Sequence, residues 1–380
     1  MRKFSSGTLR HICSPPTLTS GRRAAIQHVA ALFVSVAVVL APAGCGYEHN
    51  PAGRDAVDAE GPTSSTGTST ASVSAGTSQQ PSNPLPAQGI EVFKAAWGTG
   101  PDQVGEPGNH TTGGILEGPA SFVVANDGSI YLLDANNSRV LLISPAGEVT
   151  KAIPIETREP TDIALAADGS VIVDDSLGTA TIQAYSTNGG LKAKLKLPAN
   201  AQGVILWTQG DVTYSFMALD MDKGPGRGGY VPIYQGGAFQ DPAQTMAQGS
   251  SDKPLPGGSV NLSTRGSTVV ATINNTGKSP VLVSLDPDLS SSVETDRLPS
   301  GETTLSFLVE VKDASGALTG VSHRILWVVD RAGGIKKFDL GIERFRGDGT
   351  VATRVGPDGM IYYLNGDPAG GIRIDRFALD

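Results

Sequence analysis

Two stretches of the chain repeat one pattern 41 residues apart. Residues 119–134 and 160–175 each begin with proline, carry an Asp-Gly step at the same offset and end in aspartate. A third copy, residues 356–365, keeps the Asp-Gly step and has Asn365 in place of that aspartate. Apolar runs flank every Asp-Gly step, which supplies the positive φ angles that a tight hairpin needs. The repeated unit is therefore expected to be a small antiparallel sheet.

The same strand rhythm continues where the repeat is less regular. Residues 269–273 and 280–285 form one pair of short apolar runs separated by a polar turn, and residues 324–330 and 334–338 form another. No stretch in this region keeps the apolar spacing of a helix, so few helices are expected. A period near 41 with about four short strands per unit is typical of a β-propeller. We therefore predict an all-β chain in which each blade buries its faces against its neighbours.

The number of blades follows from the length of the repetitive region. Residues 89–380 hold about seven periods, but residues 223–258 are rich in Gly, Pro and Gln and are interpreted as an insertion. A six-bladed propeller is the prediction, with seven blades as the alternative. Residues 90–97 have the composition of a strand and are expected to pair beside residues 372–377, which would close the ring and cover the open edge of the last blade.

These repeats resemble a known propeller family. Residues 97–100 read Trp-Gly-Thr-Gly, and residues 119–134 and 136–140 follow them in the manner of an NHL repeat. The resemblance implies the fold more firmly than the function, because the motif is structural. The family includes ligand-binding sensors, scaffolds for protein interactions, and a few lyases and lactonase-like hydrolases.

The first 44 residues have the features of an export signal. They carry five basic and no acidic residues, and the apolar run at residues 29–41 is shorter than a membrane span. Residues 40–45 resemble the lipobox of bacterial lipoproteins, in which the cysteine, here Cys45, receives a lipid, although Pro42 stands where leucine is usual. Cleavage before Cys45, ordinary cleavage after Ala43 and an uncleaved anchor remain the alternatives. Export by the general or the twin-arginine route is also open.

A Ser/Thr/Gly/Pro-rich segment, residues 45–88, follows the signal. It has too few large apolar side chains to offset its ordering entropy, so we expect a disordered linker that holds the domain of residues 89–380 away from the membrane. The predicted location is the outer face of the bacterial cytoplasmic membrane, with the membrane as a partner through the lipid on Cys45. A secreted protein is the alternative.

Charge and cysteine content exclude several classes of function. The chain has a net charge of −8, and loss of the five basic residues of the signal makes the mature chain more acidic still. Phosphate backbones would be repelled, so no nucleic-acid partner is expected. After the signal, Cys45 is the only cysteine, which leaves no thiol chemistry for the domain.

Catalysis at a divalent metal is the alternative function. Propeller lyases hold zinc with several histidines, and the domain keeps only His110 and His323. Lactonase-like propellers hold calcium with carboxylate and amide oxygens from several blades. The residues that we consider for such a site are Asp162, Asn274, Asn275 and Asn365. Nothing in their spacing requires a calcium site, so neither catalytic residues nor a cofactor are assigned.

Binding is the main functional hypothesis. A propeller gathers the loops of all its blades around one funnel, where distant segments meet one ligand or partner. Polar and aromatic residues near the expected strand ends are the candidate ligand-binding residues: Arg158, Asp162, Trp207, Tyr214, His323 and Arg354. Blade packing and surface ion pairs are the alternative roles for them. The predicted function is an exported, lipid-anchored module that binds a protein, peptide or glycan.

Overall fold

The computed structural model describes residues 84–106, 119–199, 201–219, 228–241, 249–265, 268–285, 293–343, 351–367 and 369–379. The predicted signal peptide, Cys45 and nearly all of the predicted linker lie outside these residues. Within them, no helix has the length and apolar character that a membrane crossing requires.

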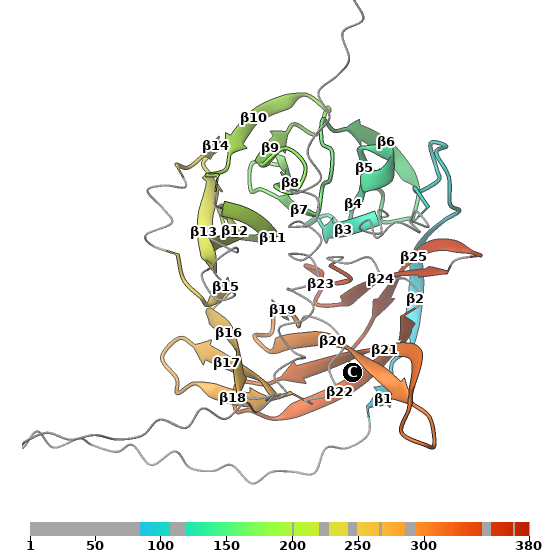
Figure 1. The fold of residues 1–380 in the computed structure, drawn as a ribbon, viewed down its shortest axis with the longest axis vertical. Coiled ribbons are helices and arrows are strands. Elements are labelled where there is room, and N and C mark those ends of the chain that lie inside the picture. The colour runs from blue at the N-terminus through green and yellow to red at the C-terminus, as the bar shows by residue number, and fades with distance from the viewer. Residues whose placement is uncertain are drawn as a thin grey trace, which may run out of the picture.

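Six antiparallel sheets form a ring of blades, as Figure 1 shows in a view down the ring axis. Blade 1 contains β3 (Pro119–Val124), β4 (Ile130–Asp134), β5 (Arg139–Ile143) and β6 (Val149–Pro154). A 3₁₀ turn, η1 (Ala135–Asn137), joins β4 to β5. Blade 2 contains β7 (Asp162–Leu165), β8 (Val171–Asp175), β9 (Thr181–Tyr185) and β10 (Leu191–Lys196). Blade 3 contains β11 (Ala201–Gln209), β12 (Val212–Leu219), β13 (Gly228–Gln235) and β14 (Ala238–Phe239).

The other three blades follow in chain order. Blade 4 contains β15 (Lys253–Leu255), β16 (Gly258–Arg265), β17 (Thr268–Asn275) and β18 (Val281–Ser284). Blade 5 contains β19 (Glu294–Arg297), β20 (Thr303–Lys312), β21 (Leu318–Val329) and β22 (Ile335–Glu343). A short strand, β1 (Leu85–Pro86), adds to β22 in parallel. Blade 6 contains β23 (Thr353–Val355), β24 (Ile361–Asp367), β25 (Gly371–Phe377) and β2 (Gly89–Ala95).

The ring closes as the sequence predicts. Strand β2, from the start of the domain, pairs antiparallel with β25 near the end of the chain and forms the outermost strand of blade 6. In Figure 1, β2 lies beside β25, which places the two ends of the domain in one sheet. The prediction of six blades is confirmed.

Apolar clusters fill five of the spaces between adjacent blades in the described part of the chain. Along β4, Ile130 and Leu132 pack with residues of blade 6, whereas Tyr131 and Leu133 pack with residues of blade 2. This alternation follows from the two-residue period of a strand. Further clusters fill the spaces between blades 2 and 3, 4 and 5, and 5 and 6. The core is therefore a ring of layers between blades.

The repeated Asp-Gly steps form the expected turns. Gly128, Gly169 and Gly359 have φ angles of 84°, 79° and 76°, which glycine adopts without strain. In each turn, the aspartate Oδ1 accepts a hydrogen bond from the backbone nitrogen two residues later. The side chain thus fixes the turn that joins the first and second strands of the blade.

One prediction about the middle of the chain is wrong. Residues 223–258 are not an insertion, because they contain β13, β14 and β15. Two residues made the longest of these strands, β13, difficult to recognise from the sequence. Its first residue, Gly228, lies where a side chain would meet the ring of Phe216, and Pro232 lies next to a shift in the pairing between β12 and β13. Glycine and proline are thus local accommodations within a regular blade.

Candidate functional site

Asp162 is the centre of a buried hydrogen-bond network at the inner strands of the ring. One carboxylate oxygen, Oδ1, accepts hydrogen bonds from Ser121 Oγ at 2.5 Å and from Arg354 Nη2 at 3.1 Å. The other oxygen, Oδ2, accepts a hydrogen bond from the backbone nitrogen of Leu206 at 2.7 Å. These partners belong to blades 1, 6 and 3, and Asp162 belongs to blade 2. One carboxylate therefore ties four blades together.

Arg354 completes this network from the far side of blade 1. Its Nε donates to the carbonyl oxygen of Phe122 at 3.0 Å, and the side chain is 8% exposed. The repeat explains why Ser121 meets Asp162, since the two positions are 41 residues apart and equivalent in adjacent blades. Arg354 has no such repeat equivalence with Asp162.

Lys253 occupies the inner strand of blade 4. Its ammonium group donates to the carbonyl oxygen of Thr295 in blade 5 and lies 4.2 Å from the centroid of the Trp207 ring in blade 3. Burial lowers the pKa of Lys253 to about 8, an effect that the negative charge of Asp296 opposes. Such a lysine is held by an aromatic face and a carbonyl instead of by water.

Asp296 supplies the second buried carboxylate of the inner strands. Its Oδ2 accepts a hydrogen bond from the backbone nitrogen of Val355 at 3.0 Å, and its Oδ1 accepts one from the backbone nitrogen of Arg297 at 2.7 Å. Burial raises the pKa of Asp296, and the positive charge of Lys253 opposes this rise. The inner strands thus hold two cations, Lys253 and Arg354, together with two carboxylates. We call these four residues and Trp207 the axial cluster.

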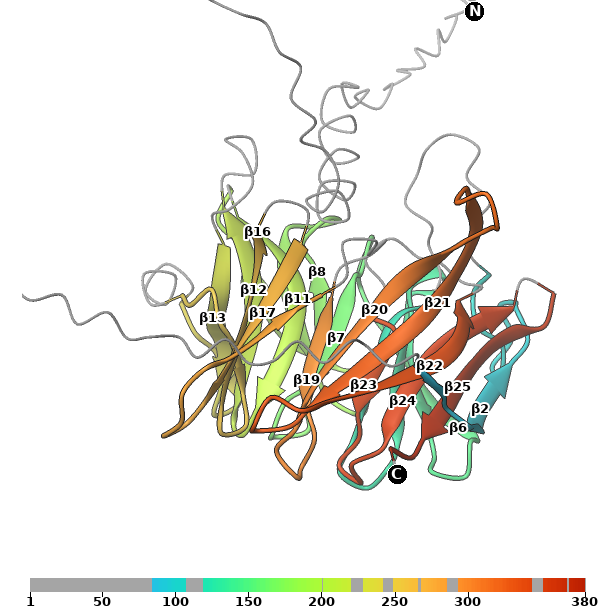
Figure 2. The same ribbon diagram turned by 90° about the horizontal axis from the view of Figure 1, so that it is seen from below.

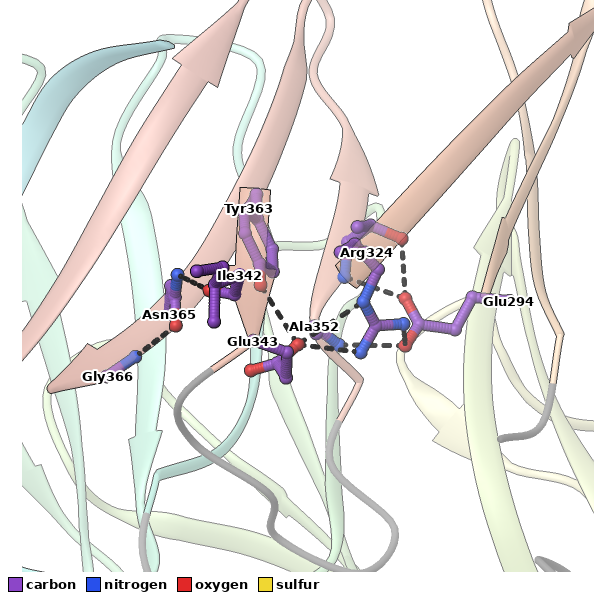
Figure 3. A network of polar contacts seen from close by, with 9 residues as sticks. Glu294, Arg324, Ile342, Glu343, Ala352, Tyr363, Asn365 and Gly366 are labelled. Carbon is purple, nitrogen blue, oxygen red and sulfur yellow. Dashed lines mark hydrogen bonds and ion pairs between the residues drawn. The ribbon is translucent and has the colours of Figure 1, made fainter. Parts of the chain in front are cut away.

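A second buried network joins blades 5 and 6 beside the axial cluster (Figure 3). Arg324 on β21 lies between two carboxylates, with Nη1 at 3.0 Å from Glu294 Oε1 and Nη2 at 3.0 Å from Glu343 Oε2. Tyr363 of blade 6 donates to the same Glu343 oxygen at 3.0 Å. Although burial alone would lower the pKa of Arg324, the two carboxylates raise it.

The backbone of blade 6 takes part in this network as well. Glu294 accepts hydrogen bonds from the backbone nitrogens of Ala352 and Thr353, at 3.1 and 2.7 Å. Because Glu294 begins β19 and Thr353 begins β23, the carboxylate fixes the inner strand of blade 6 against that of blade 5. Both networks therefore act first as inter-blade contacts.

The repeated acidic position ends the second strand of its blade and binds the preceding connection. Asp134 accepts a hydrogen bond from the backbone nitrogen of Gly105 at 2.9 Å. Asp175 accepts hydrogen bonds from the backbone nitrogens of Arg158 and Glu159 at 3.0 and 2.8 Å. In blade 6, Asn365 instead donates to the carbonyl oxygen of Ile342. The partner in blade 6 is a carbonyl oxygen, which accepts hydrogen bonds. An asparagine amide can donate to it, whereas an aspartate carboxylate cannot.

The structure brings together three of the six candidate binding residues. Asp162 and Arg354 form a buried ion pair, and Trp207 belongs to the same axial cluster through Lys253. The indole Nε1 of Trp207 is buried and has no hydrogen-bond partner in the described part of the chain. Sequence reasoning selected these three residues as polar or aromatic groups near strand ends, and their mutual contacts come from the closure of the ring.

The other three candidates are not members of the axial cluster. Arg158 is exposed in the connection from blade 1 to blade 2, and its backbone nitrogen binds Asp175. Tyr214 is half-buried on β12, opposite Trp207. His323 is on β21, where its Nδ1 lies 2.8 Å from Asp339 Oδ2 of β22.

Sequence reasoning missed the partners that complete these networks. Lys253 fell within the predicted insertion, so it was not considered as a residue of an inner strand. Asp296, Glu294 and Arg324 lie in blade 5, where the repeat is too irregular to align. A polar residue inside an apolar strand, as Arg324 is in β21, was the one available signal, because a buried charge in a sheet requires a partner.

The residues considered for calcium do not meet at one point. Asn274 donates to Asp252 Oδ2 at 2.9 Å within blade 4, and Asn365 donates to Ile342 O in the network of Figure 3. Asp162 is bound by Ser121, Arg354 and Leu206. In the part of the chain that the structure describes, no three His, Cys, Asp or Glu side chains are grouped in a way that could hold a metal ion. His110 lies outside that part.

A long hairpin sets blade 5 apart from the others. Strands β20 and β21 have 10 and 12 residues, and Figure 2 shows the end of β21 reaching farther along the ring axis than β24 and β25. Its outer part carries three exposed apolar side chains. Val311 is 36% exposed, Leu318 is 60% exposed and Val321 is 38% exposed. We call residues 309–323 the blade 5 ribbon. Apolar side chains clustered on an exposed strand pair commonly mark an interaction surface.

Comparisons with known proteins identify no family for this chain. No model of a known protein family matches the chain, and no curated protein matches it. Virginiamycin B lyase from Staphylococcus aureus is similar in structure, with a TM-score of 0.37 and 10% identity over 70% of this chain and 96% of that chain. The WD40 propeller domain of Doa1 gives a TM-score of 0.40 and 10% identity over 77% and 98% of the two chains.

A member of the DUF4221 family from Bacteroides vulgatus gives a TM-score of 0.40 and 9% identity over 77% of this chain and 98% of that chain. The six-bladed assignment itself comes from the strand pairing described above.

Proposed function

We propose that this protein is an exported, lipid-anchored binding module with NHL-like repeats, whose propeller recognises an extended segment of another polypeptide. Cys45 would attach the chain to the outer face of the cytoplasmic membrane, and residues 45–88 would act as the spacer. The observation that carries the proposal is the blade 5 ribbon, which exposes apolar side chains on a rigid ring.

The charges of the inner strands support a binding role over a chemical one. Asp162 accepts hydrogen bonds from three other blades, and Glu294 binds Arg324 and the backbone of blade 6. These groups hold the blades in register, so the ring is suited to present a surface. The acidic mature chain also disfavours nucleic acid and anionic lipid as partners of that surface.

The sheet of blade 5 supports an extended polypeptide as the partner of the ribbon. Strand β1 already joins this sheet as an additional extended segment, pairing Leu85 with Phe338 and Pro86 with Asp339 of β22. Among the described strands, β22 pairs with β21 only as far as Ser322, and beyond that point β21 pairs only with β20, at Leu318. An extended polypeptide with apolar side chains can therefore continue the sheet at that edge, where backbone hydrogen bonds supply the affinity.

The test compares substitutions in the blade 5 ribbon with a substitution of an exposed apolar residue on blade 4. A photo-crosslinking residue at Leu318, in the full-length protein in its own cells, is expected to capture one protein. That protein, once purified, should bind the full-length chain, and the variant L318K/V321K should bind it at least about tenfold more weakly. The control L282K changes a side chain that is 52% exposed on blade 4 and should leave binding unchanged. Equal binding by all three chains, or crosslinking only to lipid, would contradict the proposal.

A further inference from the structure

A pocket lies at the seam where the ring closes, between blades 6 and 1. It has a volume of about 400 Å³, within the range of small-molecule sites. Two turns of blade 1 and the Asp-Gly turn of blade 6 form its rim, and Val92 of the closing strand β2 contributes to its wall. The turn that contains Gly147 fits closely against β2, since a Cβ atom at Gly147 would lie 2.4 Å from Val92 O. The pocket is thus a product of ring closure.

A partly exposed guanidinium group lines this pocket. The side chain of Arg376 is 37% exposed and is hydrogen-bonded to Tyr362, and among the described residues its buried Nε has no hydrogen-bond partner. The nearest carboxylate contact of Arg376 is a long one, 3.7 Å from Nη1 to Asp358 Oδ2. That carboxylate already accepts hydrogen bonds from Tyr362 Oη at 3.0 Å and from the backbone nitrogen of Met360 at 3.1 Å. Arg376 is therefore only partly neutralised, and the exposed part of its guanidinium group can bind an anionic group of a ligand.

The opposite charge is also present in the pocket. Asp127 and Asp358 come from the Asp-Gly turns of adjacent blades, and both contribute to the lining with Asn126. In Asp127, Oδ1 accepts the turn hydrogen bond from the backbone nitrogen of Ser129. Two carboxylates against one guanidinium would repel a simple anion, whereas a ligand with an additional cationic group would meet both signs of charge.

Apolar wall residues limit the size and the character of the ligand. Val92, Ile130, Pro145 and Pro357 surround the charged groups. The aliphatic part of a short ligand would contact these side chains. Its charged ends would reach Arg376 and the two aspartates. A free amino acid or a dipeptide has this combination of size, charges and apolar surface.

We propose that this pocket binds a small zwitterion of the size of an amino acid or dipeptide, with its carboxylate on Arg376 and its ammonium group between Asp127 and Asp358. This site goes beyond the proposed function, because it lies on other blades than the blade 5 ribbon and uses different chemistry. Since β2 forms part of the wall, occupancy also stabilises the closed ring by mass action.

The test uses the full-length chain and alanyl-alanine, measured by calorimetry and by thermal unfolding. Alanyl-alanine is expected to bind and to raise the unfolding temperature, and N-acetyl-alanyl-alanine and alanyl-alaninamide, which each lack one charge, should bind at least about tenfold more weakly. R376Q should lose binding to a similar extent. The matched control R373Q removes a neighbouring arginine whose Nε lies 2.9 Å from Asp375 Oδ2 and should bind normally.

Other outcomes have definite meanings. Absence of alanyl-alanine binding, equal binding of the three peptides, or equal losses in R376Q and R373Q would overturn the proposal. If R376Q unfolds, the exposed-turn variant N126K replaces it, because an added cation beside the two carboxylates should block the ammonium group. The ribbon variant L318K/V321K should bind alanyl-alanine normally, so failure of one site is separable from failure of the other.

Discussion

Arg354 and Asp162 form a buried ion pair although 192 residues separate them in the chain. Their side chains are 8% and 1% exposed, and the intervening blade 1 supplies two further acceptors to Arg354, Ser121 Oγ and Phe122 O. The pair exists only when the ring is closed. It therefore links the end of the chain to blade 2 as directly as the pairing of β2 with β25 links the two ends of the domain.

Replacement of Arg354 by leucine should strongly destabilise the ring. The substitution leaves Asp162 buried without its counter-charge, a change that typically costs about 3–5 kcal/mol. Urea unfolding of the full-length chain at neutral pH measures this loss. The control K194L removes a lysine that is 41% exposed beside Glu156, itself 70% exposed, and should cost less than about 1 kcal/mol. Equal losses in the two variants would show that Arg354 has no special place in the closed ring.

Asp174 should make the protein less stable as the pH rises. Burial raises the pKa of Asp174 to about 7, and within the described residues its Oδ2 has no hydrogen-bond partner. Between pH 4 and pH 7 the folded state holds a proton that the unfolded state has lost, so the free energy of unfolding falls as the pH rises. D174N removes this titration and should stabilise the chain at pH 8, by at most about 4 kcal/mol, and have little effect near pH 4.

A second aspartate in the same blade provides a control of opposite sign. Although burial opposes it, hydrogen bonds from Lys192 and Ser170 lower the pKa of Asp168. D168N should therefore destabilise the chain at neutral pH, and this loss should begin to shrink only below about pH 4, as the pH falls toward the lowered pKa of the folded state. Unfolding curves from pH 2 to pH 8 for the three chains measure both trends. Parallel curves for D174N and the unmodified chain would refute the assignment of Asp174.

Sequence reasoning found the fold because its signals are local. An Asp-Gly step defines a turn within four residues, and two such steps 41 residues apart define a blade. Closure by residues 90–97 followed from the need to cover a sheet edge. The wrong interpretation of residues 223–258 has the same origin, since composition alone does not show that Gly228 and Pro232 occupy special positions in β13.

The contacts between the residues of the axial cluster could not be predicted from the sequence, for a physical reason. Asp162, Lys253 and Arg354 lie on three different blades, and only the closed ring places them near one another. Each residue alone was equally consistent with a surface ion pair or a turn. A repeat reveals equivalent positions, as it does for Ser121 and Asp162, but it does not reveal a partner such as Arg354 that has no equivalent in the other blades.

Lys253 should matter more as the pH rises from 4 to 7. Four charged side chains interact electrostatically with the ammonium group of Lys253: Asp296, Arg354, Asp162 and Glu294. Burial raises the pKa of Asp296, and Lys253 limits that rise. In K253M the carboxylate of Asp296 loses this support, so the variant should lose about 3–5 kcal/mol at pH 7 and less near pH 4, where Asp296 gains a proton.

Lys337 is the control for Lys253, because it also lies over a tryptophan ring but is more exposed. Lys337 Nζ lies 4.1 Å from the centroid of the Trp327 ring, in the more exposed strand β22. K337M should therefore cost about 1 kcal/mol or less, with no dependence on pH in this range. Urea unfolding at pH 4 and pH 7 measures both variants. A pH-independent loss in K253M would show that packing on Trp207, and not the charge, is what Lys253 contributes.

Ring closure should be sensitive to a single methyl group at Gly371. This glycine begins β25 with a φ of 93°, and a Cβ atom there would lie 2.0 Å from Ala95 O of the closing strand β2. Gly277 has a similar φ of 74° and no atom within 4 Å of its Cβ position. G277A should cost about 1 kcal/mol from backbone strain alone, and G371A should cost at least about 2 kcal/mol more because β2 must shift. Faster amide exchange in β2, in G371A but not in G277A, would locate the damage at the closure. Equal unfolding free energies for the two variants would mean that the pairing of β2 with β25 adds little to the stability of the ring.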